Sequence, residues 1–262
     1  MPEGDTLYRT AAGLRPYLVG RTVPQLHRII GQRIGAVESL GKNLLIRFDN
    51  GLELRTHLRM NGTWHRYHPG ERWRRPPGRA RLVLEVPGAV AVCFDAPVVE
   101  LLEQRAETIH PPLAGLGPDL LDPEFDADEV LRRLRDPGRA GTPVAEVLVD
   151  QRAMAGLGNV YKSEVAWIER VSPFAPIGEL DDATLRRLVA TARRLLVANT
   201  SSRRGPERVT TTGDPAAPGP LYVYRRTGRP CRRCRMPIAS TRQGADLPRS
   251  TYWCPTCQGP RR

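Results

Sequence analysis

Four of the five cysteines in this 262-residue chain fall close together near its C-terminus, and their spacing limits how that part can fold. Cys231 and Cys234 form one Cys-x2-Cys pair, Cys254 and Cys257 form a second, and 19 residues separate the pairs. Each pair can supply two thiolates from one tight turn, so together they match a tetrahedral zinc site. Two disulfides are the alternative, which the lack of a secretion signal disfavours. We expect one structural Zn2+, because four thiolates leave no coordination position for a reacting water.

The chain is strongly basic, and the excess charge is concentrated in the cysteine-rich part. The formal net charge is +12, and residues 221–262 hold ten arginines against one acid, Asp246. This charge favours a polyanion such as nucleic acid as the partner. No apolar run is long enough to cross a bilayer, and no signal-peptide pattern is present. We expect a monomer in the cytoplasm, associated with the nucleoid, without a membrane partner or a small-molecule cofactor.

The first residues read Met1-Pro2-Glu3-Gly4. Initiator methionine is usually removed before a residue as small as proline, which would leave Pro2 with a secondary amine. An α-amino group titrates near ~7.7–8.0, so part of it is neutral at physiological pH and can attack an aldehyde carbon to form an imine. Glu3 beside it could transfer protons at the same centre. The alternative is that a Met-Pro start has no chemical meaning.

The hydropathy pattern predicts an α+β protein whose N-terminal part, residues 1–112, is an antiparallel β-sandwich with a leading helix. The helix is expected over residues 6–16, with Asp5 as its N-cap. The arginine-rich residues 66–81 are expected to interrupt the sheets as a loop. Strands are expected over residues 19–27, 33–40, 44–48, 52–58, 79–86 and 89–94.

Residues 113–220 change to a helical period, which predicts a helical domain. Asp181 or Asp182 is the expected N-cap of its longest helix. Residues 200–220 hold almost no large apolar side chain and are expected to be a mobile loop. Residues 221–262 are expected to form short strands around the zinc. Helices are expected over residues 127–135, 144–151, 160–169 and 183–198.

A glycine-rich segment joins two of these helices. Residues 150–161 read DQRAMAGLGNVY, so one helix ends near Gln151 and the next begins beside Asn159. Backbone N–H groups and an amide side chain at a helix N-terminus form a natural phosphate site, and a glycine such as Gly158 lets a DNA backbone approach closely. The alternative is a turn that serves tight packing alone.

Only two of the 40 basic residues are lysines, Lys42 and Lys162. Lysine can lose its proton and act as an acid or base, whereas a guanidinium effectively cannot. A lysine retained in so arginine-rich a chain therefore indicates a chemical role, although either one could be retained by chance. For Lys162 we favour a solvated position over contact with DNA.

Together, the N-terminal Pro-Glu-Gly, the Gly-Leu-Gly-Asn-Val-Tyr turn and the four-cysteine finger resemble the formamidopyrimidine-DNA glycosylase/endonuclease VIII family. The order and spacing agree over essentially the whole chain. The resemblance implies a helix–two-turn–helix DNA-binding domain over residues 113–220 and a C-terminal zinc finger over residues 221–262. It also implies a bifunctional enzyme of base excision repair, which removes oxidised bases from damaged DNA as a glycosylase and cleaves the strand by β,δ-elimination as an AP lyase.

The resemblance implies catalytic roles for four residues. Pro2 resembles the nucleophile that attacks C1′ of the damaged nucleotide, and Glu3 resembles the proton donor that opens the deoxyribose ring. Lys42, at the start of a core strand, resembles the lysine that assists base release and β-elimination. Arg249, five residues before Cys254, resembles the finger arginine that grips the flanking phosphate and aids δ-elimination.

The resemblance also implies DNA contacts. Asn159, with Gly158, resembles the turn that contacts phosphate near the lesion. A base inside a duplex is out of reach of a protein amine, so the nucleotide must be flipped out. Met60 resembles a residue inserted into the stack where the damaged base leaves.

Some residues depart from the family pattern. The formamidopyrimidine branch usually begins Pro-Glu-Leu and carries an Arg-Arg-Phe wedge, whereas this chain has Gly4 and reads DAPVV over residues 95–99. This favours the endonuclease VIII branch, which prefers oxidised pyrimidines. Thr6 stands where the family usually has a second glutamate, which leaves open a catalytically weakened damaged-DNA-binding protein of the same fold. A third reading, a ribosomal or transcriptional zinc-ribbon protein, is disfavoured by Pro2 and Lys42.

Overall fold

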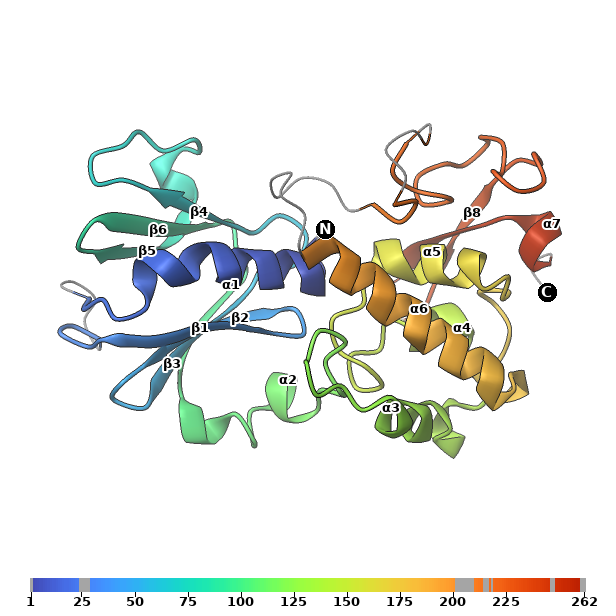
Figure 1. Cartoon of the computed structure of the whole chain (residues 1–262), viewed down its shortest axis with the longest axis horizontal. Helices are drawn as coiled ribbons and strands as arrows, with labels where there is room; N and C mark the ends of the chain where they lie inside the picture. The colour runs from blue at the N-terminus through green and yellow to red at the C-terminus, as the bar shows by residue number, and fades with distance from the viewer. Residues whose placement is uncertain are drawn as a thin grey trace. The chain divides into compact units, whose positions relative to one another are not determined.

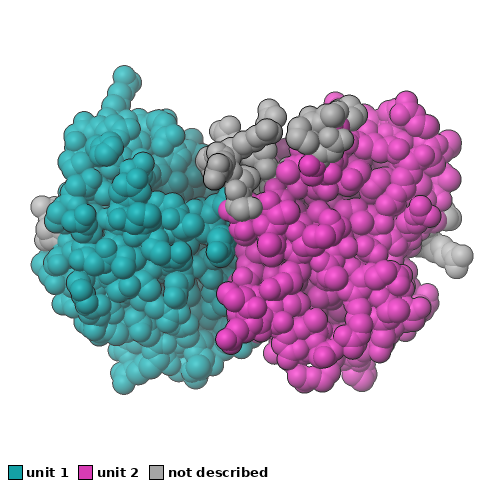
Figure 2. Space-filling view, viewed as in Figure 1, with its two compact units in different colours: residues 1–115 teal, residues 116–262 magenta. Residues whose placement is uncertain are grey.

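The chain folds into two compact units, residues 1–115 and residues 116–262 (Figure 2). The computed structural model describes residues 2–23, 29–200, 210–213, 217, 219–245 and 248–259. Most of the loop expected to be mobile over residues 200–220 lies outside the described residues. The predicted α+β class is confirmed: a leading helix is followed by antiparallel sheets, then by helices and a small C-terminal sheet (Figure 1). The four-cysteine site lies in this last part of the chain.

Unit 1 contains two antiparallel sheets that share one core. The four-stranded sheet has the order β1-β2-β3-β7, and the three-stranded sheet has the order β4-β6-β5. Their strands are β1 (Ile34–Leu40), β2 (Asn43–Phe48), β3 (Leu52–His57), β4 (Thr63–Tyr67), β5 (Ala80–Val86), β6 (Ala89–Phe94) and β7 (Val98–Glu103). The shared apolar cluster includes Val37, Ile46 and Leu54 from the first sheet and Trp64, Leu84 and Ala91 from the second. This arrangement is a β-sandwich.

Helix α1 (Gly4–Leu18) packs into the same core through a stripe of apolar side chains. The predicted N-cap, Asp5, is wrong. Glu3 occupies the cap position, where its carbonyl accepts the first helical N–H bonds, and Asp5 lies inside the first turn, 3.3 Å from Arg9. An acidic side chain in a first turn also suits the helix dipole, so composition alone does not separate the two positions. The stripe consists of Leu7, Ala11, Leu14 and Leu18.

Two strands were missed in unit 1, and one was wrongly predicted. Of the strand expected over residues 19–27, the described part forms only an isolated bridge between Thr22 and Arg33. Strand β7 has no alternation of buried and exposed side chains, since nearly all of them are half-buried. Strand β4 runs into the arginine-rich segment. A period-two pattern therefore gave little signal for either.

Unit 2 combines helices with a small two-stranded sheet. Its predicted longer helices are confirmed, although the second ends early, at Val147. Asp181 caps the longest helix by accepting a hydrogen bond from Thr184 N at 2.6 Å. The elements are α3 (Ala127–Leu134), α4 (Val144–Val147), α5 (Asn159–Ile168), α6 (Asp182–Thr200), β8 (Ala239–Gln243), β9 (Arg249–Trp253) and α7 (Pro255–Gln258), and α2 (Pro111–Ala114) ends unit 1. Short 3-10 turns lie at Pro77–Arg79, Gln104–Ala106, Pro137–Arg139 and Ile177–Glu179. No described helix has the length and apolar character needed to span a membrane.

One carboxylate in unit 1 is buried at a cost to the fold. Glu53 on β3 is fully buried, and its Oε2 lies 3.4 Å from Arg47 Nε. Arg47 is shared with Glu38 at 3.0 Å and Glu107 at 2.9 Å. Burial, and then Glu107, raises the pKa of Glu53 to about 7. The pKa of Glu53 in the folded protein is therefore higher than its value of about 4.3 in the unfolded chain. Protonated Glu53 contributes its full stability below a pH of about 4.3, and this contribution is lost as the pH rises through about 7.

Glu53→Gln removes this titration. We expect the substitution to raise the free energy of unfolding by about 1–3 kcal/mol at pH 8 and by much less at pH 5. Urea denaturation at the two pH values measures the difference. Glu85→Gln, at an exposed position of β5, is the control and should change stability by less than about 0.5 kcal/mol. An equal gain at both pH values would contradict the assignment.

Candidate functional site

Pro2 and Lys42 lie at the same end of the β-sandwich in unit 1. The end of α1 lies beside the start of β1, because Gly20 N donates a hydrogen bond to Ile34 O at 2.7 Å. From there, β1 runs antiparallel to the helix, back toward its N-terminus. The helix rises about 24 Å from Leu18 back to Pro2, and the strand rises about 26 Å onward to Lys42. The start of α1 and the β1–β2 turn therefore lie at one end of the sandwich (Figure 1).

The β3–β4 turn, which contains Met60, lies at the same end of the sandwich. Asn43, next to Lys42, pairs with His57 across β2 and β3, and His57 pairs with Val98 at the start of β7. The β3–β4 turn thus begins beside the β1–β2 turn. Met60 in that turn is 62% exposed. We call this region the Lys42 end, made of residues 41–42, 58–62 and 95–97 with the start of α1.

Buried polar groups support the Lys42 turn. Lys42 itself is half-buried, whereas Asn43 is buried and donates from Nδ2 to Leu40 O at 3.0 Å. Asn43 Oδ1 accepts from Arg55 Nε at 2.9 Å, and Arg55 Nη1 donates to Glu100 at 2.5 Å. Arg55 is only 4% exposed, so water does not compete for these bonds. The chain fixes the position of the turn that carries the lysine.

His57 is a neutral hydrogen-bond donor at the Lys42 end. Burial, then the charges of Arg55 and Lys42, lowers the pKa of His57 to about 4. Its Nδ1 accepts a hydrogen bond from Arg59 N at 3.2 Å, which leaves the proton on Nε2. The turn that follows is tight, since a Cβ on Gly62 would lie 2.6 Å from Leu58 O. Met60 is therefore held on a rigid turn.

Glu3 lies at the N-terminus of α1 and is fully buried, next in sequence to Pro2. The N–H groups of the first turn and the helix dipole favour a negative group there. Thr6, one turn later, is half-buried, and its carbonyl accepts a hydrogen bond from Thr10 at 2.8 Å. A threonine at this position offers a hydroxyl but no second carboxylate to the start of the helix.

The glycine-rich turn in unit 2 is shaped by Gln151, for which the sequence predicted no role. Gln151 Nε2 donates to Val149 O at 2.9 Å and to Leu157 O at 3.0 Å, and its Oε1 accepts from Gly156 N at 3.1 Å. Gly156 has a φ of +99°, which other residues rarely adopt. One amide side chain thus fixes the loop that leads into Gly158.

Helix α5 begins at Asn159 with Gly158 in the N-cap position. Asn159 is 8% exposed, and the N–H groups of the first helical turn and the dipole together favour an anion at this end. The predicted start of a helix beside Asn159 is confirmed, and phosphate binding at this turn stays a prediction. Lys162 is 1% exposed, so the solvated position favoured for it is wrong.

Glu164 on α5 holds two segments that lead toward the finger. The side chain is fully buried, and its carboxylate accepts hydrogen bonds from the backbone N–H groups of Tyr222 at 2.7 Å and of Val223 and Tyr224 at 2.8 Å. The hydroxyl of Thr211 donates to it as well. Four donors satisfy the buried charge, so this carboxylate fastens both segments to α5.

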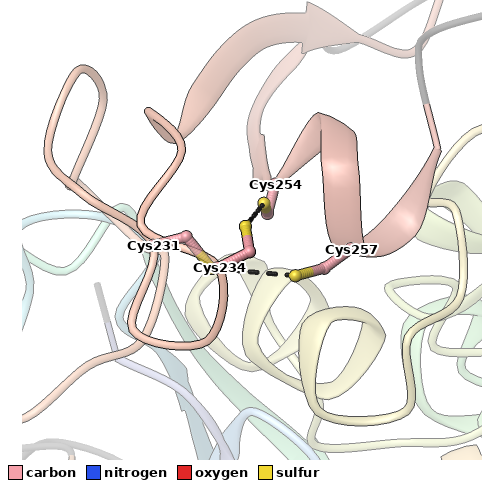
Figure 3. A group of neighbouring side chains, drawn as sticks. All are labelled: Cys231, Cys234, Cys254 and Cys257. Atoms are coloured by element: carbon pink, nitrogen blue, oxygen red, sulfur yellow. Dashed lines mark hydrogen bonds between the residues drawn. The ribbon is translucent and has the colours of Figure 1, made fainter.

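The four predicted zinc ligands come together in unit 2 (Figure 3). Their sulfur atoms all lie within 4.8 Å of one another, with Cys231 and Cys257 3.9 Å apart and Cys234 and Cys254 3.3 Å apart. Zn–S bonds of about 2.3 Å in a tetrahedron place sulfurs about 3.8 Å apart, so the set fits one Zn2+ with no open position. Burial, and then the neighbouring thiols, raises the pKa of Cys257 to about 12, which a bound cation would reverse.

The finger is fastened to α5. Tyr252 N on β9 donates to Ser163 Oγ at 3.3 Å, one helical turn after Asn159, and Arg233 donates to two carbonyls at the end of α5. Arg249 begins β9 and is half-buried. Its guanidinium has no hydrogen-bond or ion-pair partner within the described ranges. The Asn159 turn and Arg249 therefore belong to one packed unit with charge available for phosphate.

Sequence reasoning missed the supporting residues Arg55, Gln151 and Glu164. Gln151 follows an apolar run and Glu164 lies in the largely apolar helix α5, whereas Arg55 lies on β3 among other polar residues but at a buried position. A buried charge must be paired, so such an interruption signals a local network. The pattern could have marked these positions but not their partners, which are distant in sequence.

Three family models match successive parts of the chain. The formamidopyrimidine-DNA glycosylase N-terminal domain matches residues 24–97, the formamidopyrimidine-DNA glycosylase H2TH domain matches residues 116–206, and the zinc finger found in FPG and IleRS matches residues 228–259. Among solved structures, a Lactococcus lactis Fpg (MutM) complex with DNA containing N7-benzyl-Fapy-dG is similar in fold, with a TM-score of 0.81, 22% identity and coverage of 98% of this chain and 99% of that one.

Relatives match over the full length. The probable endonuclease 8 2 of Streptomyces coelicolor is 41% identical over 98% of this chain and 94% of that protein. The DNA-(apurinic or apyrimidinic site) lyase Nei2 of Mycolicibacterium smegmatis is 39% identical over 98% and 99%, and the endonuclease 8 of Escherichia coli is 32% identical over 98% and 100%. These identities confirm the resemblance inferred from the motifs: the chain belongs to the formamidopyrimidine-DNA glycosylase/endonuclease VIII family, on its endonuclease VIII side.

Proposed function

We propose that this chain is a bifunctional DNA glycosylase and AP lyase that removes oxidised pyrimidines through a Schiff base at Pro2 and cleaves the strand by β,δ-elimination. The observation that carries the proposal is the Lys42 end, where the sandwich gathers the N-terminus, a half-buried lysine and an exposed methionine turn. These are the groups that an imine-forming base-excision enzyme needs. The names of the full-length relatives, endonuclease 8 and AP lyase, agree with this activity class.

In the proposed reaction, the neutral amine of Pro2 attacks C1′ of the flipped nucleotide, and the base leaves with the electron pair of the glycosidic bond. The ionised carboxylate of Glu3 takes the N–H proton from the attached amine and donates it to O4′ as the ring opens. The product is a cationic imine between Pro2 and C1′, which acidifies the C2′ hydrogens. Lys42 assists base release and removal of a C2′ proton, and the C3′–O bond breaks with departure of the 3′ phosphate.

The second elimination breaks the C5′–O bond, and water then hydrolyses the imine to regenerate the free amine. Arg249 and the Asn159 turn of unit 2 bind phosphates that flank the lesion, and Arg249 favours departure of the second phosphate by neutralising its charge. Met60 enters the stack that the base has left. One chain supplies every one of these groups, so we propose that it acts on nucleoid DNA as a monomer without a small-molecule cofactor.

A second candidate is a damaged-DNA-binding protein of the same fold with weakened catalysis. Thr6 favours this reading, because the start of α1 then has one fewer carboxylate for positioning the sugar. Binding would be retained and turnover lost. The two candidates differ in whether a covalent intermediate forms.

Borohydride reduction of the imine tests the proposal directly. Protein with a verified free Pro2 terminus, mixed with an oligonucleotide that contains thymine glycol or an abasic site, is expected to give a covalent adduct with DNA. Pro2→Gly, or a tag retained before Pro2, should reduce the adduct sharply while DNA binding persists. No adduct from the verified wild-type protein would support the binding-protein alternative. Full trapping by the tagged protein would show that another amine reacts.

Gln151→Ala tests the phosphate turn. The substitution leaves Gly156 N and two carbonyls without their partner, so we expect a loss of stability of about 1–3 kcal/mol and DNA affinity at least about tenfold lower. Fluorescence anisotropy with folded protein measures the affinity. Gln104→Ala is the control, because Gln104 also bonds two carbonyls but lies in unit 1, in the turn that follows β7. Equal affinity of the two variants would contradict the role.

Removal of zinc should weaken DNA binding, because the finger that carries Arg249 loses the bonds that hold it together. We expect at least about a tenfold loss of affinity in metal-free protein, with recovery on adding Zn2+. Cys93→Ala is the control: Cys93 is buried in the sandwich, burial raises the pKa of its thiol to about 12, and the variant should retain one zinc. Unchanged affinity in verified metal-free protein would refute the structural role.

A further inference from the structure

The outer face of the three-stranded sheet carries a group of arginines that the proposed reaction does not use. They come from the β4–β5 connection and the start of β5, and we call them the arginine surface. The only acidic side chains with them are Glu71 and Asp95. The group lines two open hollows, of about 630 and 420 Å³. It consists of Arg72, Arg74, Arg75, Arg79 and Arg81.

An aromatic cluster orders this connection. Trp73 stacks on Tyr67 with ring centres 6.1 Å apart and meets Phe94 edge-on at 5.8 Å. Tyr67 is fully buried, and its hydroxyl accepts a hydrogen bond from Arg74 N at 3.0 Å. The sheet thus has a second apolar face, which Trp73 covers. Because this contact orders the connection, its arginines are presented at fixed places, and little entropy remains to be lost when they bind.

Asp95 joins the two hollows and neutralises only part of their charge. It lies 2.5 Å from Arg75 and 2.8 Å from Arg79, and these contacts, Arg79 first, lower its pKa. Arg72 and Arg81 are exposed and have no hydrogen-bond or ion-pair partner in the described part of the chain. The five arginines face two acidic side chains, Glu71 and Asp95, so the surface keeps a net charge of +3.

The arginine surface continues from the Lys42 end. Its second hollow is lined by Asn61, the neighbour of Met60, and by residues 95–97, which belong to that end. Arg81 is the extra residue of a bulge, since Ala80 pairs with Phe94 and the next pair is one residue out of register. A bulge redirects a side chain out of the regular alternation, and here it does so beside the Met60 turn.

We propose that the arginine surface binds phosphates of the DNA duplex beyond the lesion, as a second backbone contact of unit 1. The inference rests on the proposed function, because it requires that the Lys42 end meets DNA. Exposed guanidiniums without protein partners suit phosphate, to which they bind in a bidentate manner. Such contacts add affinity independent of sequence and release counterions.

The dependence of affinity on salt tests this inference. Arg72→Ala/Arg81→Ala is compared with Arg21→Ala/Arg105→Ala, which removes the same charge from exposed positions of unit 1 away from the sheet that bears the surface. Binding to a duplex with a tetrahydrofuran abasic analogue is measured between 50 and 300 mM salt. We expect the first variant to reduce the slope of log K against log salt by about 1.8, and the control by less than half of that.

A third variant separates charge from folding. Arg72→Lys/Arg81→Lys should restore most of the slope, since each lysine keeps a phosphate-binding charge. Equal slopes for the two alanine variants would overturn the inference, as expected if the surface binds an acidic protein instead. Borohydride trapping by the wild-type protein is scored separately. Trapping without a difference in slope would refute only the arginine surface, and a difference in slope without trapping would refute only the proposed chemistry.

Discussion

The pairing register of the four-stranded sheet determines which connections lie together at the Lys42 end of unit 1. Asn43 faces His57, and His57 faces Val98, so three connections emerge at one end of the sandwich. A shift of one residue would reverse the faces of β2 and β3 and move Arg55 away from Asn43. The buried bonds from Asn43 through Arg55 to Glu100 therefore fix both the register and the lysine turn. The same contacts thus stabilise the sheet and position Lys42 for the proposed chemistry.

In unit 2, a metal site and a buried carboxylate hold the candidate DNA-binding residues in place, as the strand register does in unit 1. The apolar cluster of the finger is small, and one Zn2+ held by the four sulfurs would cross-link it. Glu164 then ties the chain before the finger to the helix that presents Asn159. A buried carboxylate would be costly without its four donors, so the segment can occupy few alternative positions. The helix N-terminus and Arg249 are thus held in one unit by a metal site and a carboxylate.

The sequence predicted what is local or repeated in spacing. Short-range rules were enough to infer three features correctly: the two Cys-x2-Cys pairs, the glycine-rich turn and the helix of residues 182–200. The N-cap of α1 was predicted wrongly, because an acidic residue suits both the cap position and the first turn of a helix. Strand β7 was not predicted, because its place in the sheet depends on pairing with β3, which is far away in the sequence. Gln151 was missed for the same reason: its role depends on carbonyls whose position only the folded turn defines.

The two lysines show how far composition can carry such an argument. Their rarity suggested chemistry for Lys42, which is half-buried and lies at the same end of the sandwich as the start of α1, and its catalytic role stays a proposal. Lys162 is equally rare but is buried within α5. Arg55 is only 4% exposed as well, so burial by itself does not separate lysine from arginine in this chain. What separates the two residue types is that an ammonium can lose its proton and a guanidinium effectively cannot, and only the neighbours of a lysine decide whether that proton can serve catalysis.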